Sequence, residues 1–149
     1  MNPFDVVIAW NKASMANPPA SLMEASRKYL SDDFQNIDKN GKVLMDKNAY
    51  SALGPLLYSA FPDLKYVWGD HRQEGNDLVA TFNWEGTFKN DLDLSAMGMG
   101  LIKATGKKIV WPDFKTRFTV KNDQITRIQE IYGGLEPFLE PLGVKMPAA

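Results

Sequence analysis

The spacing of hydrophobic residues along the chain changes once, after Phe61. Before that residue, apolar side chains recur every three or four positions, as they do on one face of a helix. This spacing predicts helices near 3–15, 20–31 and 46–60. After it, apolar and polar residues alternate, which is typical of strands with one buried face. The alternation predicts strands near 65–72, 77–87, 107–120 and 124–133.

Residues at the ends of the predicted helices support them. Asn2 and Asp46 stand where N-cap residues lie, and both residue types accept hydrogen bonds from the free amides of a first helical turn. Ser21 and Glu24 have the spacing of a capping box at the start of the second helix. Lys39-Asn40-Gly41 is a turn sequence between short apolar stretches, so we expect a short strand or hairpin there.

Helices followed by a meander of strands indicate the α+β class. The clearest alternation places Leu78, Ala80, Phe82 and Trp84 on one face of a strand. We therefore expect the N-terminal helices to cover one face of a curved antiparallel or mixed sheet. The length of 149 residues suits one domain, 1–149.

Between residues 88 and 105 the alternation disappears. A long segment without a pattern is usually functional or mobile. It carries glycine at Gly98 and Gly100 and flexible apolar side chains, among them Met97 and Met99. We expect this segment to be a mobile lid over a pocket.

The last two predicted strands carry the candidate chemistry. The first places aromatic and branched side chains on one face, Phe114 among them. The second places this set on one face: Thr126, Ile128, Glu130 and Tyr132. If the two faces coincide, Glu130 lies among apolar side chains, where an ionised carboxylate is costly unless it is paired or protonated. The alternative is a different register with Glu130 in water, because the opposite face of that strand is also mixed.

Composition narrows the class of protein. Hydrophobic residues make up 44% and charged residues 23%, as in soluble globular domains. Seventeen basic and eighteen acidic residues give a net charge of −1, so nothing recruits nucleic acid or an anionic membrane. There is no cysteine, and no stretch approaches the length of a membrane span or has the pattern of a signal peptide. We expect a cytoplasmic protein with no membrane partner.

The sequence carries no motif for a metal or a cofactor. His71 is the single histidine, so it cannot form a histidine cluster, and we interpret it as a surface or hydrogen-bonded residue rather than a base. The acidic residues in the predicted turns do not match a calcium loop. Gly98 and Gly100 lack the lysine and the preceding strand of a phosphate loop. We expect no metal and no cofactor.

Several short segments spread along the chain can be compared, by their order and spacing, with those of known protein families. They are Ala9-Trp10-Asn11, Asp33-Phe34-Gln35-Asn36, Phe61-Pro62-Asp63-Leu64, Glu74-Gly75-Asn76, Trp84-Glu85-Gly86-Thr87, Thr105-Gly106-Lys107 and the closing strand pair. In order and spacing they resemble the SnoaL-like polyketide cyclase family, which has a nuclear-transport-factor-like fold. The resemblance runs from about Val7 to Gly143. It implies that the sheet and the first three helices enclose a conical hydrophobic pocket.

The resemblance also implies a site. The acid/base carboxylate of the characterised cyclases falls at Glu130, where those enzymes have aspartate. A pocket histidine on the preceding strand falls at Phe114, although a bulge at Pro112 would bring Asp113 inward instead. The pocket wall and substrate-binding residues are expected to be Trp10, Asn36, Leu53, Leu57, Trp68, Phe82, Trp84, Phe114, Ile128 and Tyr132.

The function implied by the resemblance is aldol-type acid/base chemistry on a small hydrophobic carbonyl compound, without a cofactor. One alternative is a ligand-binding protein with no activity, which the loss of the histidine favours. A second alternative is an epoxide-hydrolase-like enzyme, which needs a site of Asp, Arg and Asp. Arg117 and Arg127 fall on the outward positions, which counts against that alternative.

We also expect a homodimer. Val79, Trp111 and Ile131 lie on positions opposite to the pocket, and a second copy of the chain would cover such an apolar patch.

Overall fold

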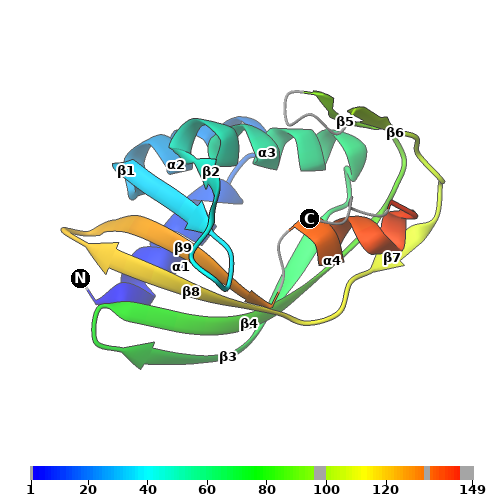
Figure 1. Ribbon diagram of the computed structural model, residues 1–149. Coiled ribbons are helices and arrows are strands. Elements are labelled where there is room, and N and C mark those ends of the chain that lie inside the picture. The colour runs from blue at the N-terminus through cyan, green and yellow to red at the C-terminus, as the bar shows by residue number, and fades with distance from the viewer. Residues whose placement is uncertain (1, 96–99, 133–134, 145–149) are drawn as a thin grey trace.

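The computed structural model describes residues 2–95, 100–132 and 135–144. Three helices lie on one side of a curved sheet (Figure 1): α1 (Pro3–Ser14), α2 (Ala20–Tyr29) and α3 (Lys47–Ala60). The strands of this sheet are β1 (Leu30–Ile37), β2 (Val43–Asp46), β3 (Lys65–Glu74), β4 (Asp77–Thr87), β7 (Lys108–Val110), β8 (Phe114–Lys121) and β9 (Gln124–Tyr132). The predicted α+β class is confirmed.

The sheet is mixed rather than purely antiparallel. Its main path runs β2-β1-β9-β8-β4-β3, and β7 pairs with β4 beside it. β1 is parallel to β9, while the other pairs of the path are antiparallel. The N-terminal helices and the C-terminal strands are therefore joined through β1, which lies next to the strand that carries Glu130.

The predicted N-cap residues cap α1 and α3, but the one predicted for α2 does not. The side chain of Asn2 accepts from the amide of Asp5 at 2.9 Å, and Asp46 accepts from the amide of Ala49 at 2.9 Å. Ser21, predicted to cap α2, lies inside that helix and donates to the carbonyl of Ser14. It therefore ties α2 to the end of α1 instead of capping its own helix.

One hydrophobic core lies between α1 and the sheet. Val6 and Val7 of α1 are fully buried, and they pack in one cluster with Phe118, Ile125 and Ile128 of the sheet. Because burial of such side chains is the main favourable term in folding, this cluster fixes α1 on the inner face of the sheet. It also fixes β8 and β9, which hold the candidate site.

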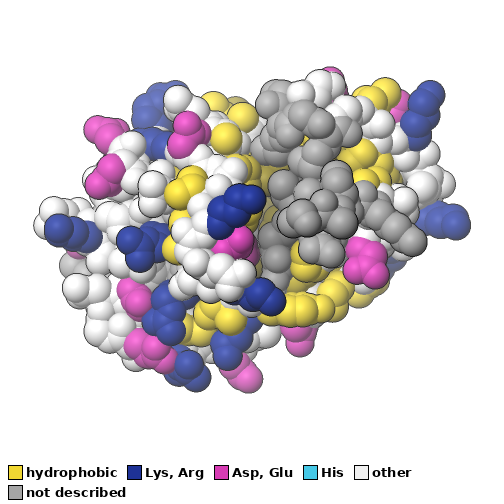
Figure 2. All heavy atoms as spheres, in the orientation of Figure 1, with side chains coloured by type: hydrophobic (Ala, Val, Ile, Leu, Met, Phe, Trp, Pro, Cys, Tyr) yellow, Lys and Arg dark blue, Asp and Glu magenta, His cyan; other side chains and the backbone are white. Residues whose placement is uncertain are grey.

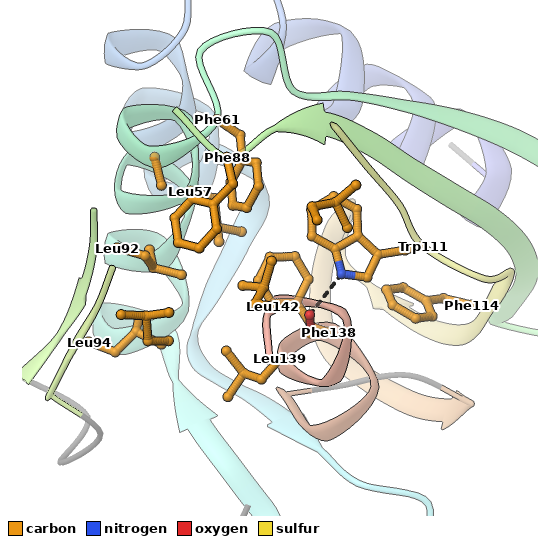
Figure 3. Packing of buried hydrophobic residues seen from close by; sticks show 13 residues of the cluster. Leu57, Phe61, Phe88, Leu92, Leu94, Trp111, Phe114, Phe138, Leu139 and Leu142 are labelled. Atoms are coloured by element: carbon orange, nitrogen blue, oxygen red, sulfur yellow. Dashed lines mark hydrogen bonds between the residues drawn. The ribbon is translucent and has the colours of Figure 1, made fainter. Parts of the chain in front are cut away.

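A second core closes the other end of the sheet (Figure 3). The predicted strand near 107–120 is interrupted between β7 and β8, and Trp111 in the gap is 1% exposed. Its ring stacks on Phe138 at 4.8 Å, and its indole Nε1 donates to the Phe138 carbonyl at 2.8 Å. Phe138 belongs to α4 (Leu135–Leu139), which is followed by the turn η2 (Glu140–Leu142).

The segment predicted as a lid contains two strands that the sequence did not predict. β5 (Leu92–Leu94) and β6 (Gly100–Ile102) form an antiparallel pair. Leu92, Leu94 and Ile102 are buried in the second core, so the two strands have an anchored inner face. Three-residue strands are too short for alternation to reveal them. Met97, Gly98 and Met99, three of the residues on which the lid hypothesis rested, lie outside the described residues.

Two of the three residues predicted to form a dimer surface are buried, so the prediction is wrong for them. Val79 and Trp111 are 3% and 1% exposed, since Trp111 turns into the second core. Ile131 is half-buried. These residues therefore do not form an exposed apolar patch, and self-association itself stays a prediction.

Candidate functional site

A cavity of about 180 Å³ lies between the helices and the inner face of the sheet. Every predicted wall residue except Tyr132 lines it: Trp10, Asn36, Leu53, Leu57, Trp68, Phe82, Trp84, Phe114 and Ile128. Glu130 lines it too. The wall is mostly aromatic and aliphatic with few polar groups, which is the usual composition of a site for a small apolar ligand.

The face of the molecule shown in Figure 2 carries no dominant charge. Basic and acidic side chains are interspersed there, and hydrophobic side chains reach the surface near its centre. Leu44 of β2 lines the cavity and is 37% exposed, so the wall extends to solvent at this strand.

Phe114, and not Asp113, faces the cavity. Phe114 is 3% exposed and pairs with Phe82 of β4, which also lines the cavity. Asp113 is exposed and accepts a hydrogen bond from Asn83 Nδ2 at 3.1 Å. The gap at Trp111 and Pro112 ends before β8 begins, so the alternation of β8 holds from its first residue.

Tyr132 does not line the cavity and is 56% exposed. The reason is a bulge in the pairing of β8 with β9: Lys115 pairs with Tyr132 and Thr116 with Glu130, so Ile131 is an extra residue. An extra residue turns the following side chain to the other face. Tyr132 therefore shares the outward side of Lys115.

Glu130 lies in the cavity with two polar neighbours. Its Oε1 accepts a hydrogen bond from Asn36 Nδ2 at 3.1 Å, and Thr116 Oγ1 is 3.4 Å from its Oε2. Asn36 on β1 and Thr116 on β8 are each 1% exposed. The strands on either side of β9 thus each supply one donor to the carboxyl group.

Burial raises the pKa of the Glu130 carboxyl group, while the hydrogen bonds from Asn36 and Thr116 lower it by less. Within the described part of the chain, the hydrogen-bond partners of the carboxyl group are neutral side chains and not cations. A carboxyl group with a raised pKa exchanges protons closer to neutral pH, which is the property that general acid–base catalysis requires.

The raised pKa predicts a pH-dependent stability. The folded state holds the Glu130 proton more tightly than the unfolded state, whose glutamate pKa is about 4.3. The stabilisation from protonated Glu130 is therefore complete below about pH 4.3 and is lost as the pH rises through the folded-state pKa. We expect the unfolding free energy of the wild type to fall relative to that of Glu130→Gln between about pH 4 and 7. Urea denaturation across this range measures it, and a constant difference would contradict the assignment.

The sequence analysis missed several polar residues that line the cavity, among them Thr116 and Tyr58. Thr116 follows Phe114 by two residues, so alternation puts it on the same predicted face, but it was given no role. Tyr58 of α3 lines the cavity and donates to Met15 Sδ at 3.3 Å, and burial raises its pKa. The spacing of Tyr50, Gly54 and Tyr58, each four residues apart, was the available signal, because such residues share a helix face.

The other candidate chemistries do not meet at the cavity. His71 is exposed and its ring stacks on Phe4 at 4.5 Å. Arg117 binds Asp77 at 2.9 Å and Glu74 at 3.1 Å, and none of these three residues lines the cavity. Within the described ranges no group of three histidine, cysteine or acidic side chains is placed to hold a metal ion.

The described helices include none with the length and hydrophobicity needed to cross a membrane.

A family model described as a SnoaL-like domain matches residues 10–128. The chain belongs to the SnoaL-like domain family. No curated protein matches the chain. The matched residues run from Trp10 to Ile128, two residues that line the cavity, and stop two residues before Glu130.

Solved structures of SnoaL-like and related proteins share the fold. A proposed SnoaL-like polyketide cyclase from Jannaschia sp. CCS1 is 16% identical, with a TM-score of 0.66 over 85% of this chain and 82% of its own. IdmH, a proposed polyketide cyclase from Streptomyces antibioticus, is 17% identical, with a TM-score of 0.66 over 97% and 100%. A protein with a ketosteroid isomerase-like fold from Catenulispora acidiphila DSM 44928 is 15% identical, with a TM-score of 0.62 over 97% and 95%.

These structures establish the nuclear-transport-factor-like, ketosteroid isomerase-like fold of the chain. At such identities the likeness concerns the fold and not the reaction.

Proposed function

We propose that this SnoaL-like protein catalyses an aldol-type ring closure of a small, apolar carbonyl compound, with Glu130 as the acid/base residue and no cofactor. The observation that carries the proposal is a carboxyl group of raised pKa in a cavity with aromatic walls. The family match and the proposed cyclases among its structural neighbours support the reaction class.

The reaction conserves protons within the site. The Glu130 carboxylate takes a proton from a C–H group flanked by carbonyls, which leaves an enolate. The enolate carbon attacks a second carbonyl of the same molecule, so one C–C bond forms and that carbonyl becomes an alkoxide. The protonated Glu130 then returns its proton to the alkoxide, and the product is an isomer of the substrate.

The hydrogen bonds of Glu130 indicate which of its oxygens reacts. Oε1 accepts from Asn36 Nδ2 at 3.1 Å, whereas the contact of Oε2 with Thr116 is longer, at 3.4 Å. The shorter hydrogen bond holds Oε1 in place, and the longer contact leaves Oε2 freer to accept and donate a proton. We therefore assign the proton transfer to Oε2.

A binding protein without activity is the second candidate. Phe114 stands where the resemblance implies a histidine, and it contributes only an apolar wall. A histidine there would supply a hydrogen-bonding and titrating group that phenylalanine lacks.

Exchange of carbon-bound hydrogen separates the two candidates. The protein is incubated in D₂O with a panel of bicyclic ketones and β-dicarbonyl compounds, and NMR follows loss of the C–H signal next to the carbonyl. The proposed enzyme exchanges at least one compound faster than buffer does, because proton abstraction is its first step. Saturable binding without exchange across the panel would favour the binding protein.

A further inference from the structure

Trp10 lines the cavity and carries an indole N–H, which is a hydrogen-bond donor. Its Nε1 atom is buried and has no hydrogen-bond partner within the described part of the chain. Buried polar groups are nearly always paired with protein, water or a ligand, because an unpaired donor has lost its hydration without replacement. This N–H is therefore a position at which a ligand acceptor would be favoured.

The polar groups nearest to Glu130 use their own donors within the protein. Asn36 Nδ2 has two hydrogens, and it contacts two acceptors, the Ile128 carbonyl at 3.0 Å and Glu130 Oε1 at 3.1 Å. Thr116 has one hydroxyl hydrogen, directed to Glu130 Oε2. These two residues hold the carboxyl group and have no further hydrogen to donate to a substrate carbonyl.

Trp10 lies close enough to Glu130 for one small molecule to contact both. The Trp10 ring is 6.2 Å from the ring of Phe118, which pairs with Ile128 across the sheet. The next inward pair along these strands is Thr116 with Glu130. Inward positions of a strand are about 7 Å apart, which is comparable to the length of a bicyclic ring system.

We propose that Trp10 Nε1 donates a hydrogen bond to the carbonyl oxygen of the ligand, and to the enolate oxygen once Glu130 has removed the proton. This inference rests on the proposed function. It assigns Trp10 as a specificity-determining residue and defines the ligand as an apolar molecule with an acceptor oxygen about one ring away from its acidic C–H. A donor aimed where negative charge develops stabilises the transition state more than the bound substrate.

A matched pair of ligands and variants tests the inference. α-Tetralone and tetralin have the same ring skeleton, and only the ketone has an acceptor. Trp10→Phe keeps an aromatic ring and removes the N–H. We expect it to weaken binding of α-tetralone by about 10-fold, as loss of one buried hydrogen bond does, and binding of tetralin by less than about 2-fold. Phe118→Leu alters the wall beside Trp10 without removing a donor, so it should weaken both ligands to the same extent.

A second readout uses the wild type, so it does not depend on the folding of a variant. In the ¹⁵N-labelled protein, the indole resonance missing from the Trp10→Phe spectrum identifies Trp10. That resonance should move downfield with α-tetralone and much less with tetralin. The inference would be overturned if Trp10→Phe weakened the binding of both ligands equally, or if both ligands shifted the indole resonance equally. Failure of the wild type to bind either ligand would overturn it as well. Exchange of the ligand's carbon-bound hydrogen in D₂O tests the proposed reaction independently of this inference. Absence of that exchange would overturn the proposed reaction, but selective binding of the ketone would still stand.

Discussion

Glu130→Gln is expected to lower turnover by about 100-fold or more, with ligand affinity nearly unchanged. Loss of a general acid–base group usually lowers rates by about 100- to 10,000-fold. The amide keeps the shape of the side chain and can still accept the hydrogen bond from Asn36, which is 3.1 Å away in the wild type. It cannot carry the proton. The fall should therefore appear in kcat, with KM changed little, if KM reports binding.

The same substitution separates catalysis from stability. Within the described residues the carboxyl group of Glu130 has no cationic hydrogen-bond partner, so its removal from the cavity should leave the melting temperature at neutral pH unchanged or raise it. Glu24→Gln is the matched control, because Glu24 is exposed on α2 and the chemical change is the same. We expect the control to keep full activity. Full activity of Glu130→Gln would assign the reaction to another group or leave a binding protein.

The order and type of the larger elements could be predicted because each has enough residues to show a period. α1, α3 and β4 begin and end within about a residue of the predicted positions. The sequence did not reveal β5 and β6, since three residues cannot establish alternation. It also did not reveal that Trp111 leaves the strand and packs against Phe138, a residue 27 positions later in the chain. Contacts over that distance leave no local pattern.

The sequence placed Glu130 on the correct face of β9 because the strand has no bulge in that part. The faces of the residues on either side of that part were not predicted correctly. β9 has an extra residue at two points of its pairing with β8, between Thr119 and Val120 and between Lys115 and Thr116. Ile125, and not Thr126, is consequently the buried residue at one end. At the other end Tyr132 turns outward. The pairing of β9 with β8 is uninterrupted only from Arg127 to Glu130. Bulges depend on the partner strand as well as on the sequence.

The cavity combines residues from segments that the sequence does not connect. Asn36 precedes Glu130 by 94 residues and reaches it because β1 pairs with β9 in parallel. The resemblance indicated Asn36 as a wall residue, but its hydrogen bond to the carboxyl group follows only from that pairing. The same holds for the pKa of Glu130, which depends on burial by helices and strands together.

Phe138→Ala should cause the largest loss of stability among the substitutions considered. Phe138 is 6% exposed, and its ring packs on those of Trp111 and Phe61, with centroids 4.8 Å and 6.4 Å away (Figure 3). The Phe138 ring also lies 5.4 Å from that of Trp84. Its backbone carbonyl, which accepts from the Trp111 indole, is kept in alanine. The loss is therefore one of packing alone, and truncation of a buried phenylalanine costs about 3–5 kcal/mol.

Chemical denaturation of Phe138→Ala measures this cost, and Tyr132→Ala is its control. Both substitutions truncate an aromatic residue near the C-terminus, but Tyr132 is 56% exposed and lies outside the cavity, so its loss should cost less than about 1 kcal/mol. Because Phe138 also lines the cavity, its truncation should weaken ligand binding, whereas Tyr132→Ala should not. α4 has only five residues and cannot be a stable helix alone, so its position depends on this packing. A cost below about 1 kcal/mol for Phe138→Ala would mean that α4 detaches without consequence for the rest of the fold, and that the second core ends at Trp111.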